Sequence, residues 1–295
     1  VINSSSIGNV SGSSYVGGLI GNNFAYLSNS YAMGDVNGST MVGGLVGRHA
    51  DDQISNCYST GNVSGDSEIG GLAGINDDGD ISDSYATGYV DGTGDNIGGL
   101  IGRNADGASV FNSSASGDVG GYNSAGGLVG YNAAGSSVNG SYATGNVSGN
   151  NDYTGGLTGL NGGAVNNSYA TGNVSGNHDV GGLVGINDNG GTVNNSYSIG
   201  YVIGNSDVGG LVGIDEGSVD HSFYDTNTSN QSDDDGRGVP KTTAQMKTLF
   251  TFAGAGWDIE GNTTNINDGY PYLSWQIPGN SPVWYIYFDP ECEFI

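Results

Sequence analysis

The chain has 295 residues, of which 58 are glycine, and 30 acidic against 5 basic side chains give a formal net charge of −25. This glycine content excludes an ordinary helical or α/β domain, because each interior glycine costs a helix about 1 kcal/mol relative to alanine. The acidity argues against nucleic acid as a partner, because phosphate backbones are bound by clustered Lys and Arg. The longest apolar run, Val283 to Phe288, is far too short to span a bilayer, so we expect no transmembrane segment.

A repeated string organises residues 1–224. Gly-Gly-Leu-x-Gly occurs eight times, about 27 residues apart, with its leucine at Leu19, Leu45, Leu72, Leu100, Leu128, Leu157, Leu183 and Leu211. Such a period is typical of a solenoid, whose units bury their apolar faces only by stacking. We therefore predict an all-β fold, a β-solenoid of about eight 27-residue coils.

Each unit also carries a second segment, typified by Ser-Tyr-Ala-Thr-Gly-Asn-Val at residues 168–174. Strand alternation puts Ser, Ala, Gly and Val on one face and Tyr, Thr and Asn on the other. Small residues on one face favour a thin interior with Tyr and Thr rows outside; the alternative puts the Tyr row in the core. The aromatic slot holds Tyr31, Tyr58, Tyr85, Tyr142, Tyr169 and Tyr197, with Ser114 and Phe223 in the two remaining units.

Two further positions are predicted to be structural. Four residues after each leucine stands an asparagine, replaced by His49 and Asp215 in two units. Coils about 4.8 Å apart would let successive side-chain amides hydrogen-bond along a column. The glycines that flank the leucine predict either corners with positive φ or close approach of two backbones.

The repeat ends at Tyr224, and residues 225–240 are predicted to be a linker or long loop. Thr242 and Gln245 predict a capping box for a short helix, and later segments are predicted to be short strands. Residues 241–295 would then form a small mixed cap over the final coil. The alternative is a tail that donates Val283–Phe288 as a strand to the open edge of another subunit.

The eight strings and their intervening segments resemble GLUG-motif repeats of bacterial and archaeal surface proteins. The stretch Lys241–Met246, with Trp257 and Tyr270–Leu273, is similar to the segment that often follows such repeats. The resemblance implies an extracellular β-solenoid in adhesin-like or envelope-associated proteins, some of which carry a peptidase domain. The His-Glu-x-x-His motif of those peptidases does not occur in this sequence, so the resemblance implies no proteolytic activity.

Other sequence motifs for catalysis are also missing, namely the Gly-x-Ser-x-Gly elbow, the Gly-x-Gly-x-x-Gly loop and the P-loop. We therefore expect a protein that is not an enzyme, with no catalytic residue and no cofactor. Acidic turns such as Asn76–Asp80 are expected to be solvated. The alternative is calcium bound by these oxygen-rich corners, although none matches a complete calcium-binding loop.

Cys57 occupies a slot that serine fills in the other seven complete units, which predicts a buried free thiol. The alternative is a disulfide to Cys292, within one chain or between chains. Asn-x-Ser/Thr sequons are frequent. The candidate glycosylation acceptors are Asn9, Asn37, Asn62, Asn112, Asn139, Asn146, Asn173, Asn227 and Asn262.

These features predict an extracellular, non-enzymatic structural protein of a cell-surface fibre, sheath or adhesive appendage that associates with its own copies. The alternative is an adhesin that binds polysaccharide or a neighbouring or host cell surface through its Tyr and Thr columns, since aromatic rows stack on sugar rings. Ice binding by the Thr column is a third, weaker hypothesis. The candidate ligand-binding residues are Tyr142, Tyr169, Tyr197, Thr144 and Thr171.

Overall fold

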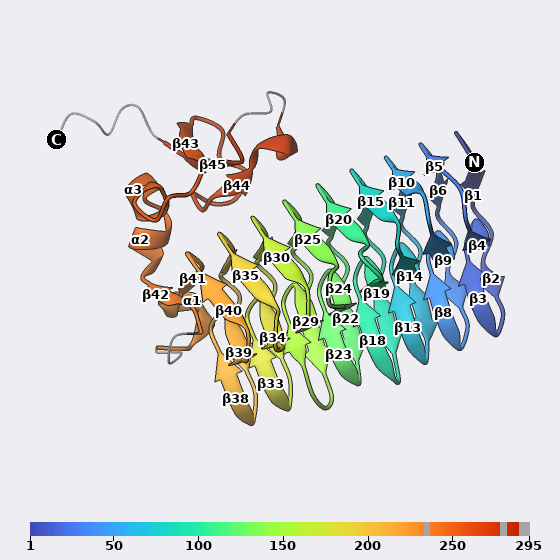
Figure 1. The fold of residues 1–295 in the computed structure, drawn as a ribbon, viewed down its shortest axis with the longest axis horizontal. Helices are drawn as coiled ribbons and strands as arrows, with labels where there is room; N and C mark the ends of the chain where they lie inside the picture. Colours follow the sequence, from blue (N-terminus) through green and yellow to red (C-terminus); the bar gives the residue numbers. More distant parts are fainter. Residues whose placement is uncertain (233–236, 278–281, 289–295) are drawn as a thin grey trace.

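The computed structural model describes residues 1–232, 237–277 and 282–288, and it confirms an all-β solenoid (Figure 1). Each coil contains five short strands, and equivalent strands of successive coils pair in parallel and in register, so that Tyr58 pairs with both Tyr31 and Tyr85. The second coil shows the pattern with β6 (Tyr31–Ala32), β7 (Val36–Asn37), β8 (Thr40–Gly43), β9 (Val46–Ala50) and β10 (Gln53–Ser55).

Five parallel sheets therefore run along the stack. Four have eight strands each, and their first and last members are β5 (Leu27–Ser28) and β40 (Ser218–Asp220), β2 (Val10–Ser11) and β37 (Val202–Ile203), β3 (Ser14–Gly17) and β38 (Ser206–Gly209), and β4 (Ile20–Asn23) and β39 (Val212–Asp215).

The fifth sheet, which carries the aromatic slot, is called the Tyr sheet. Its ten strands are β1 (Ser5–Ser6), β6, β11 (Tyr58–Ser59), β16 (Tyr85–Ala86), β21 (Ser114–Ala115), β26 (Tyr142–Ala143), β31 (Tyr169–Ala170), β36 (Tyr197–Ser198), β41 (Phe223–Asp225) and β42 (Val239–Lys241). The stack thus reaches about ten turns, slightly more than the eight expected from complete repeat strings.

The face of the Tyr sheet that carries the small residues points into the solenoid, and the tyrosines lie on its outer face. This is the first of the two orientations that the sequence allows. In β16, Ala86 is 1% exposed, whereas the adjacent Tyr85 on the opposite face of the strand is 41% exposed. The leucines of the strings lie in the main interior cluster, as Leu72 does at 0% exposure, except for the partly buried Leu19, which packs against it. The interior is therefore built from columns of identical or similar side chains that stack along the axis.

The glycines of the repeat string permit close approach of backbones rather than turns. A Cβ atom on Gly43 would lie 2.0 Å from the carbonyl oxygen of Val46, and one on Gly47 would lie 2.5 Å from that of Gly21. Positive φ occurs instead at other positions of the coil, such as the corner before the Tyr sheet, where Asn56 and Asn112 have φ of 51° and 49°. Asparagine tolerates this conformation better than most residues.

The described residues that follow Tyr224 cover the C-terminal edge of the Tyr sheet. Asp225 caps the short helix α1 (Thr226–Ser229) by accepting a hydrogen bond from the backbone of Asn227 at 2.8 Å. Strand β42 then pairs in parallel with β41 and becomes the last strand of the Tyr sheet. Tyr224 takes the inward position that Ser or Ala holds in other coils, and its fully buried ring fills the end of the core.

The cap comprises the described residues from Thr242 to Phe288. It contains α2 (Thr243–Met246), α3 (Leu249–Ala253), β43 (Ile259–Asn262), β44 (Tyr272–Leu273), the 3-10 helix η1 (Ser274–Gln276) and β45 (Trp284–Tyr287). The predicted capping box at Thr242 and Gln245 is confirmed. Figure 1 shows the cap beside the last coils, where it packs against the outer face of the Tyr sheet.

Strand β45 lies in the middle of a three-stranded sheet, parallel to β43 and antiparallel to β44. Both of its edges are therefore paired within the chain, and Trp284 is fully buried. In this structure the strand within Val283–Phe288 serves the cap and is not available for donation to another subunit. No helix in the described part of the chain is both long enough and apolar enough to cross a membrane.

The predicted column of amides is confirmed as a buried chain of hydrogen bonds, called the Asn column here. Its members are Asn23, His49, Asn76, Asn104, Asn132, Asn161, Asn187 and Asp215. The amide nitrogen of Asn104 donates to the amide oxygen of Asn132 at 3.0 Å, and that of Asn132 donates to Asn161 at 2.8 Å. Most of these nitrogens also donate to a carbonyl of their own corner, as Asn104 does to Ala108, whereas Asn132 donates to the carbonyl of Ala164 in the next coil.

His49 interrupts this column. The amide nitrogen of Asn23 donates to Nδ1 of His49 at 3.0 Å, and Nε2 of His49 lies 2.9 Å from the carbonyl of Asp52. Nδ1 must therefore be the acceptor and Nε2 the protonated donor, which is the neutral imidazole. This imidazole has no second N–H, and Oδ1 of Asn76 in the next coil is buried without a partner among the described residues.

Replacement of His49 by asparagine should therefore stabilise the fold. An amide at this position has two N–H groups, so that it can donate both to Asp52 and to the orphaned oxygen of Asn76. We expect His49→Asn to raise the free energy of unfolding by about 1–2 kcal/mol in urea titrations. Asn132→His should reproduce the interruption and lower it; equal or reduced stability of His49→Asn would contradict the assignment.

The same site predicts a pH dependence. Burial lowers the pKa of His49 from its ordinary value of 6.5, because the charged imidazolium is poorly solvated there. Protonation of Nδ1 would also oppose the N–H of Asn23. The stabilising contribution of neutral His49 is thus complete above pH 6.5 and is lost as the pH falls through its lower folded-state pKa. The stability difference between wild type and His49→Asn should widen on acidification in parallel urea titrations.

Candidate functional site: the tyrosine ladder and an adjoining cleft

Tyrosine rings of successive coils stack on the outer face of the Tyr sheet. Tyr58 lies between Tyr31 and Tyr85 at ring-centroid distances of 4.9 and 5.0 Å, with interplanar angles of 4° and 2°. This separation matches the spacing of paired strands, so the register of the sheet fixes the stacking. Tyr31 and Tyr58 are half-buried and Tyr85 is exposed, and these three rings are called the exposed Tyr ladder.

The tyrosines that the sequence selected as ligand-binding residues lie in the other half of the ladder, under the cap. Tyr169 and Tyr197 are 2% and 0% exposed. The hydroxyl of Tyr169 donates to Oε1 of Gln276 at 3.2 Å, and that of Tyr197 donates to the carbonyl of Pro271. Burial raises the pKa of both hydroxyls, which keeps them neutral donors. These two rings hold the cap, and the accessible aromatic surface lies at the exposed Tyr ladder instead.

Tyr142 is the third of these candidates. A tryptophan of the cap stacks on it where the preceding coil lacks a tyrosine. Tyr169 and Trp275 both stack on Tyr142, at 5.0 and 5.6 Å and with interplanar angles of 8° and 26°. Two near-parallel rings at these distances occupy opposite faces of Tyr142. On the side away from Tyr169, the paired coil carries Ser114 instead of tyrosine. Trp275 therefore continues the stack at the level of Ser114.

The candidate threonines lie beside the Tyr row on the outer face. Thr144 is exposed and Thr171 is half-buried, each two residues beyond a tyrosine of the ladder. The column that they belong to is interrupted by Met33, Ser116 and Ile199 in other coils. A continuous threonine array is therefore not formed, which disfavours the ice-binding hypothesis.

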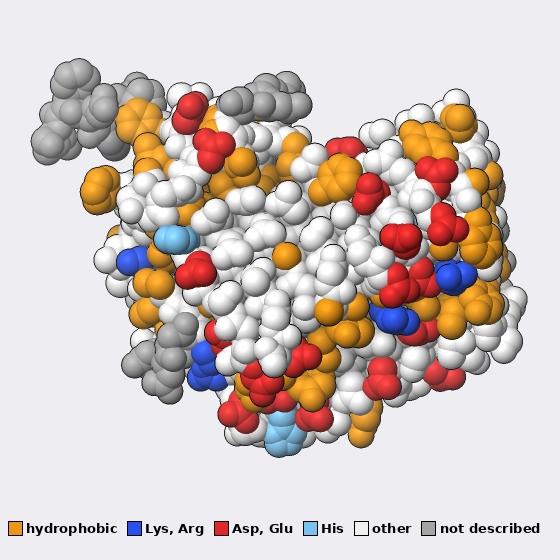
Figure 2. All heavy atoms as spheres, in the orientation of Figure 1, with side chains coloured by type: hydrophobic (Ala, Val, Ile, Leu, Met, Phe, Trp, Pro, Cys, Tyr) orange, Lys and Arg blue, Asp and Glu red, His pale blue; other side chains and the backbone are white. Residues whose placement is uncertain are grey.

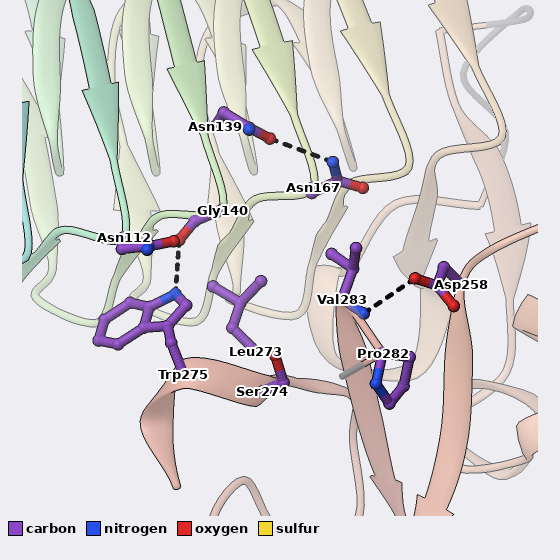
Figure 3. Close-up of a pocket in the computed structure, with 10 residues that line it drawn as sticks. All are labelled: Asn112, Asn139, Gly140, Asn167, Asp258, Leu273, Ser274, Trp275, Pro282 and Val283. Atoms are coloured by element: carbon purple, nitrogen blue, oxygen red, sulfur yellow. Dashed lines mark hydrogen bonds between the residues drawn. The ribbon is translucent and has the colours of Figure 1, made fainter. Parts of the chain in front are cut away.

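A cleft with a volume of about 400 Å³ separates the cap from the corner that precedes the Tyr sheet (Figure 3). Its solenoid side presents the side chains of Asn112, Asn139 and Asn167. Nδ2 of Asn167 donates to Oδ1 of Asn139 at 3.1 Å. Asn112 and Asn167 have φ of 49° and 48°, and Gly140 holds the equivalent corner between them with φ of 55°. The corner geometry thus brings amides of three coils to one place.

The cap side of the cleft is formed around Trp275, Val283 and Asp258. The indole N–H of Trp275 donates to the carbonyl of Gly140 at 2.8 Å, which ties η1 to the solenoid corner. The carboxylate of Asp258 accepts a hydrogen bond from the backbone nitrogen of Val283 at 3.2 Å. Figure 3 shows these groups facing the amides across the opening. Sequence reasoning missed this cleft, although Ser114 and Gly140 both depart from the repeat beside it.

Cys57 is fully buried within the coil and forms no disulfide with a described residue, and its Sγ lies 3.3 Å from the carbonyl oxygen of Ser55. Burial raises the pKa of the thiol, which keeps it protonated and unreactive. Its slot belongs to a serine column in which, for example, the hydroxyl of Ser141 accepts from the backbone nitrogen of Ser113. Cys292 lies outside the described residues, so the disulfide between the two cysteines stays a prediction.

The candidate glycosylation acceptors all reach the surface. Asn112 and Asn262 are half-buried, and the exposed members are Asn9, Asn37, Asn62, Asn139, Asn146, Asn173 and Asn227. Several also tie neighbouring coils together, as when Oδ1 of Asn146 accepts from the backbone nitrogen of Asn173 at 3.0 Å. Glycosylation of these residues stays a prediction.

Acidic side chains are spread over the visible face and basic ones are few (Figure 2). Arg48 pairs with Asp77 at 2.7 Å, and Lys247 with Asp268 at 3.0 Å. In the ranges that the structure describes, no three His, Cys, Asp or Glu side chains gather as a metal site. The turn Asn76–Asp80 was the alternative calcium site. There the carbonyl oxygen of Gly79 already accepts a hydrogen bond from the amide nitrogen of Asn76.

Comparison with known families finds the GLUG motif four times, at residues 38–64, 65–91, 93–120 and 121–148. The chain therefore carries GLUG repeats, as the resemblance indicated. Residues of the solenoid outside these four segments follow the same period and pair in the same sheets.

The chain is also similar to a protein of Evansella cellulosilytica named "Putative Gly-rich membrane protein", with 46% identity over 56 residues. This similarity covers 19% of the chain and only 6% of that protein. The similarity thus spans only a small part of a much longer relative. No solved structure matches the chain.

Proposed function

We propose that this chain is a non-enzymatic structural protein of the cell exterior, a rod within a surface fibre, sheath or adhesive appendage that associates with its own copies. The observation that carries the proposal is the alignment of side chains into columns, above all the Asn column and the tyrosine ladder. Columns repeat one chemical group along a length instead of bringing different groups to one reacting point. GLUG repeats and a β-solenoid fold fit a surface or structural repeat protein.

Sedimentation velocity of the intact chain tests the self-association in this proposal. We expect dimers or larger species whose share rises with protein concentration. A chain that stays monomeric at high concentration would overturn the proposal of self-association.

A second candidate function is carbohydrate binding, and the exposed Tyr ladder favours it. Three parallel rings with solvent-accessible edges offer repeated stacking positions along the rod, with Thr60 and Thr87 beside them. The acidity of the chain favours uncharged polysaccharides over acidic ones, since acidic polymers would be repelled. This candidate is compatible with a structural role at a cell surface.

Removal of two rings tests the second candidate. Tyr58→Ser with Tyr85→Ser should lower retention on insoluble neutral polysaccharides at least about tenfold, from the usual worth of aromatic stacking. Serine occupies the same slot naturally at Ser114, so we expect the solenoid to stay folded. Tyr122→Ser, which removes a ring of 46% exposure away from the ladder, is the control. Unchanged retention of the double variant would exclude the ladder as the binding face.

A further inference from the structure

We infer that the cleft between the cap and the solenoid binds one uncharged pyranose unit of a glycan. This site is separate from the exposed Tyr ladder and does not depend on self-association. Its volume of about 400 Å³ falls in the range of small-molecule sites, which combine apolar walls with a few convergent polar groups. The proposal depends on three properties of its described lining: a fixed aromatic wall, amide groups without a hydrogen-bond partner, and no basic side chain among the described residues.

The aromatic wall is the indole of Trp275. Its N–H donates to Gly140 and one ring face rests on Tyr142, so the ring is held in place before any ligand arrives. The same indole lines the cleft. A pyranose has C–H groups on its faces and hydroxyls around its rim, so an immobilised aromatic surface next to polar groups matches its shape and chemistry.

The polar wall has hydrogen-bonding groups that the described protein does not use. Nδ2 of Asn167 donates a hydrogen bond to Oδ1 of Asn139. In the described structure, Oδ1 of Asn167 and Nδ2 of Asn139 make no hydrogen bond. One is an acceptor and the other a donor, and neighbouring sugar hydroxyls both donate and accept. The pair is therefore complementary to two adjacent hydroxyls.

The charge of the cleft selects the class of sugar. Asp258 is the one charged side chain among the described residues that line it, and one of its oxygens already accepts from Val283. A uronate or sulfate would face this carboxylate without a compensating cation, which is unfavourable. An uncharged sugar meets no such penalty, and a free carboxylate oxygen can accept from one of its hydroxyls.

The experiment is a fluorescence titration of the intact chain, produced without glycosylation, with glucose, galactose, mannose and N-acetylglucosamine. Trp257 and Trp284 are 5% and 0% exposed, so a ligand-dependent signal reports Trp275. We expect saturable binding of at least one sugar with a Kd on the order of 1 mM, as suits a small ligand with few contacts. Because the ligand is uncharged, this Kd should not change with added salt.

Asn167→Gly should weaken binding about threefold to tenfold by removing one hydrogen-bonding group. Glycine holds the same corner naturally at Gly140, and Asn112→Gly is a second variant of the same kind. Asn56→Gly makes the same change at a corner far from the cleft and should leave binding unchanged. Circular dichroism checks that each variant is folded.

Three results would overturn the inference. The first is the lack of a saturable signal with any of the four sugars, and the second is equal binding by both cleft variants and the Asn56→Gly control. The third is binding that added salt abolishes, because contacts between an uncharged sugar and aromatic or amide groups are not screened by salt. The variant with Tyr58→Ser and Tyr85→Ser should bind these sugars as the wild type does. Failure of the ladder and failure of the cleft are therefore distinguishable.

Discussion

Parallel, in-register hydrogen bonding between coils is the constraint on which the rest of the structure depends. It places each residue directly above its counterpart one repeat earlier, as with Tyr31, Tyr58 and Tyr85. A side chain must therefore be compatible with copies of itself at a separation of about 4.8 Å. Amides meet this condition by hydrogen bonding and tyrosines by stacking, whereas like charges do so poorly. Glycine meets it where backbones of neighbouring strands come too close for a Cβ atom.

Because of this constraint, a single residue that differs from the repeat affects only its own column, and the effect depends on the residue. His49 has one N–H where asparagine has two, and an oxygen of Asn76 is left without a partner. Cys57 puts a weakly accepting sulfur into a column of serine hydroxyls. Ser114 removes a ring, and Trp275 of the cap continues the stack at that level. A departure thus weakens the column in one place and provides an attachment point in another.

Periodicity made the solenoid predictable from the sequence. The leucine spacing predicted the coil, the small residues predicted the inward face, and the recurring asparagines predicted the amide column, because each signal repeats many times. The packing of the cap was not predictable in this way. Trp275 and Gly140 are 135 residues apart, and their contact depends on where a non-repetitive, aromatic segment packs. Tyr169 and Tyr197 therefore seemed to be surface residues by their pattern, although the cap buries them.

The Asn column also has a direction, since Asn104, Asn132, Asn161 and Asn187 each donate toward the following coil. The last acceptor is Asp215, whose carboxylate receives the amide of Asn187 at 2.6 Å and has no N–H to pass on. The asparagine of an inserted coil accepts one such hydrogen bond and donates the next. Its insertion therefore creates no additional buried amide group without a hydrogen-bond partner. Gene duplication within the middle of the array can thus lengthen or shorten the rod in whole repeats, while both ends keep their original chemistry.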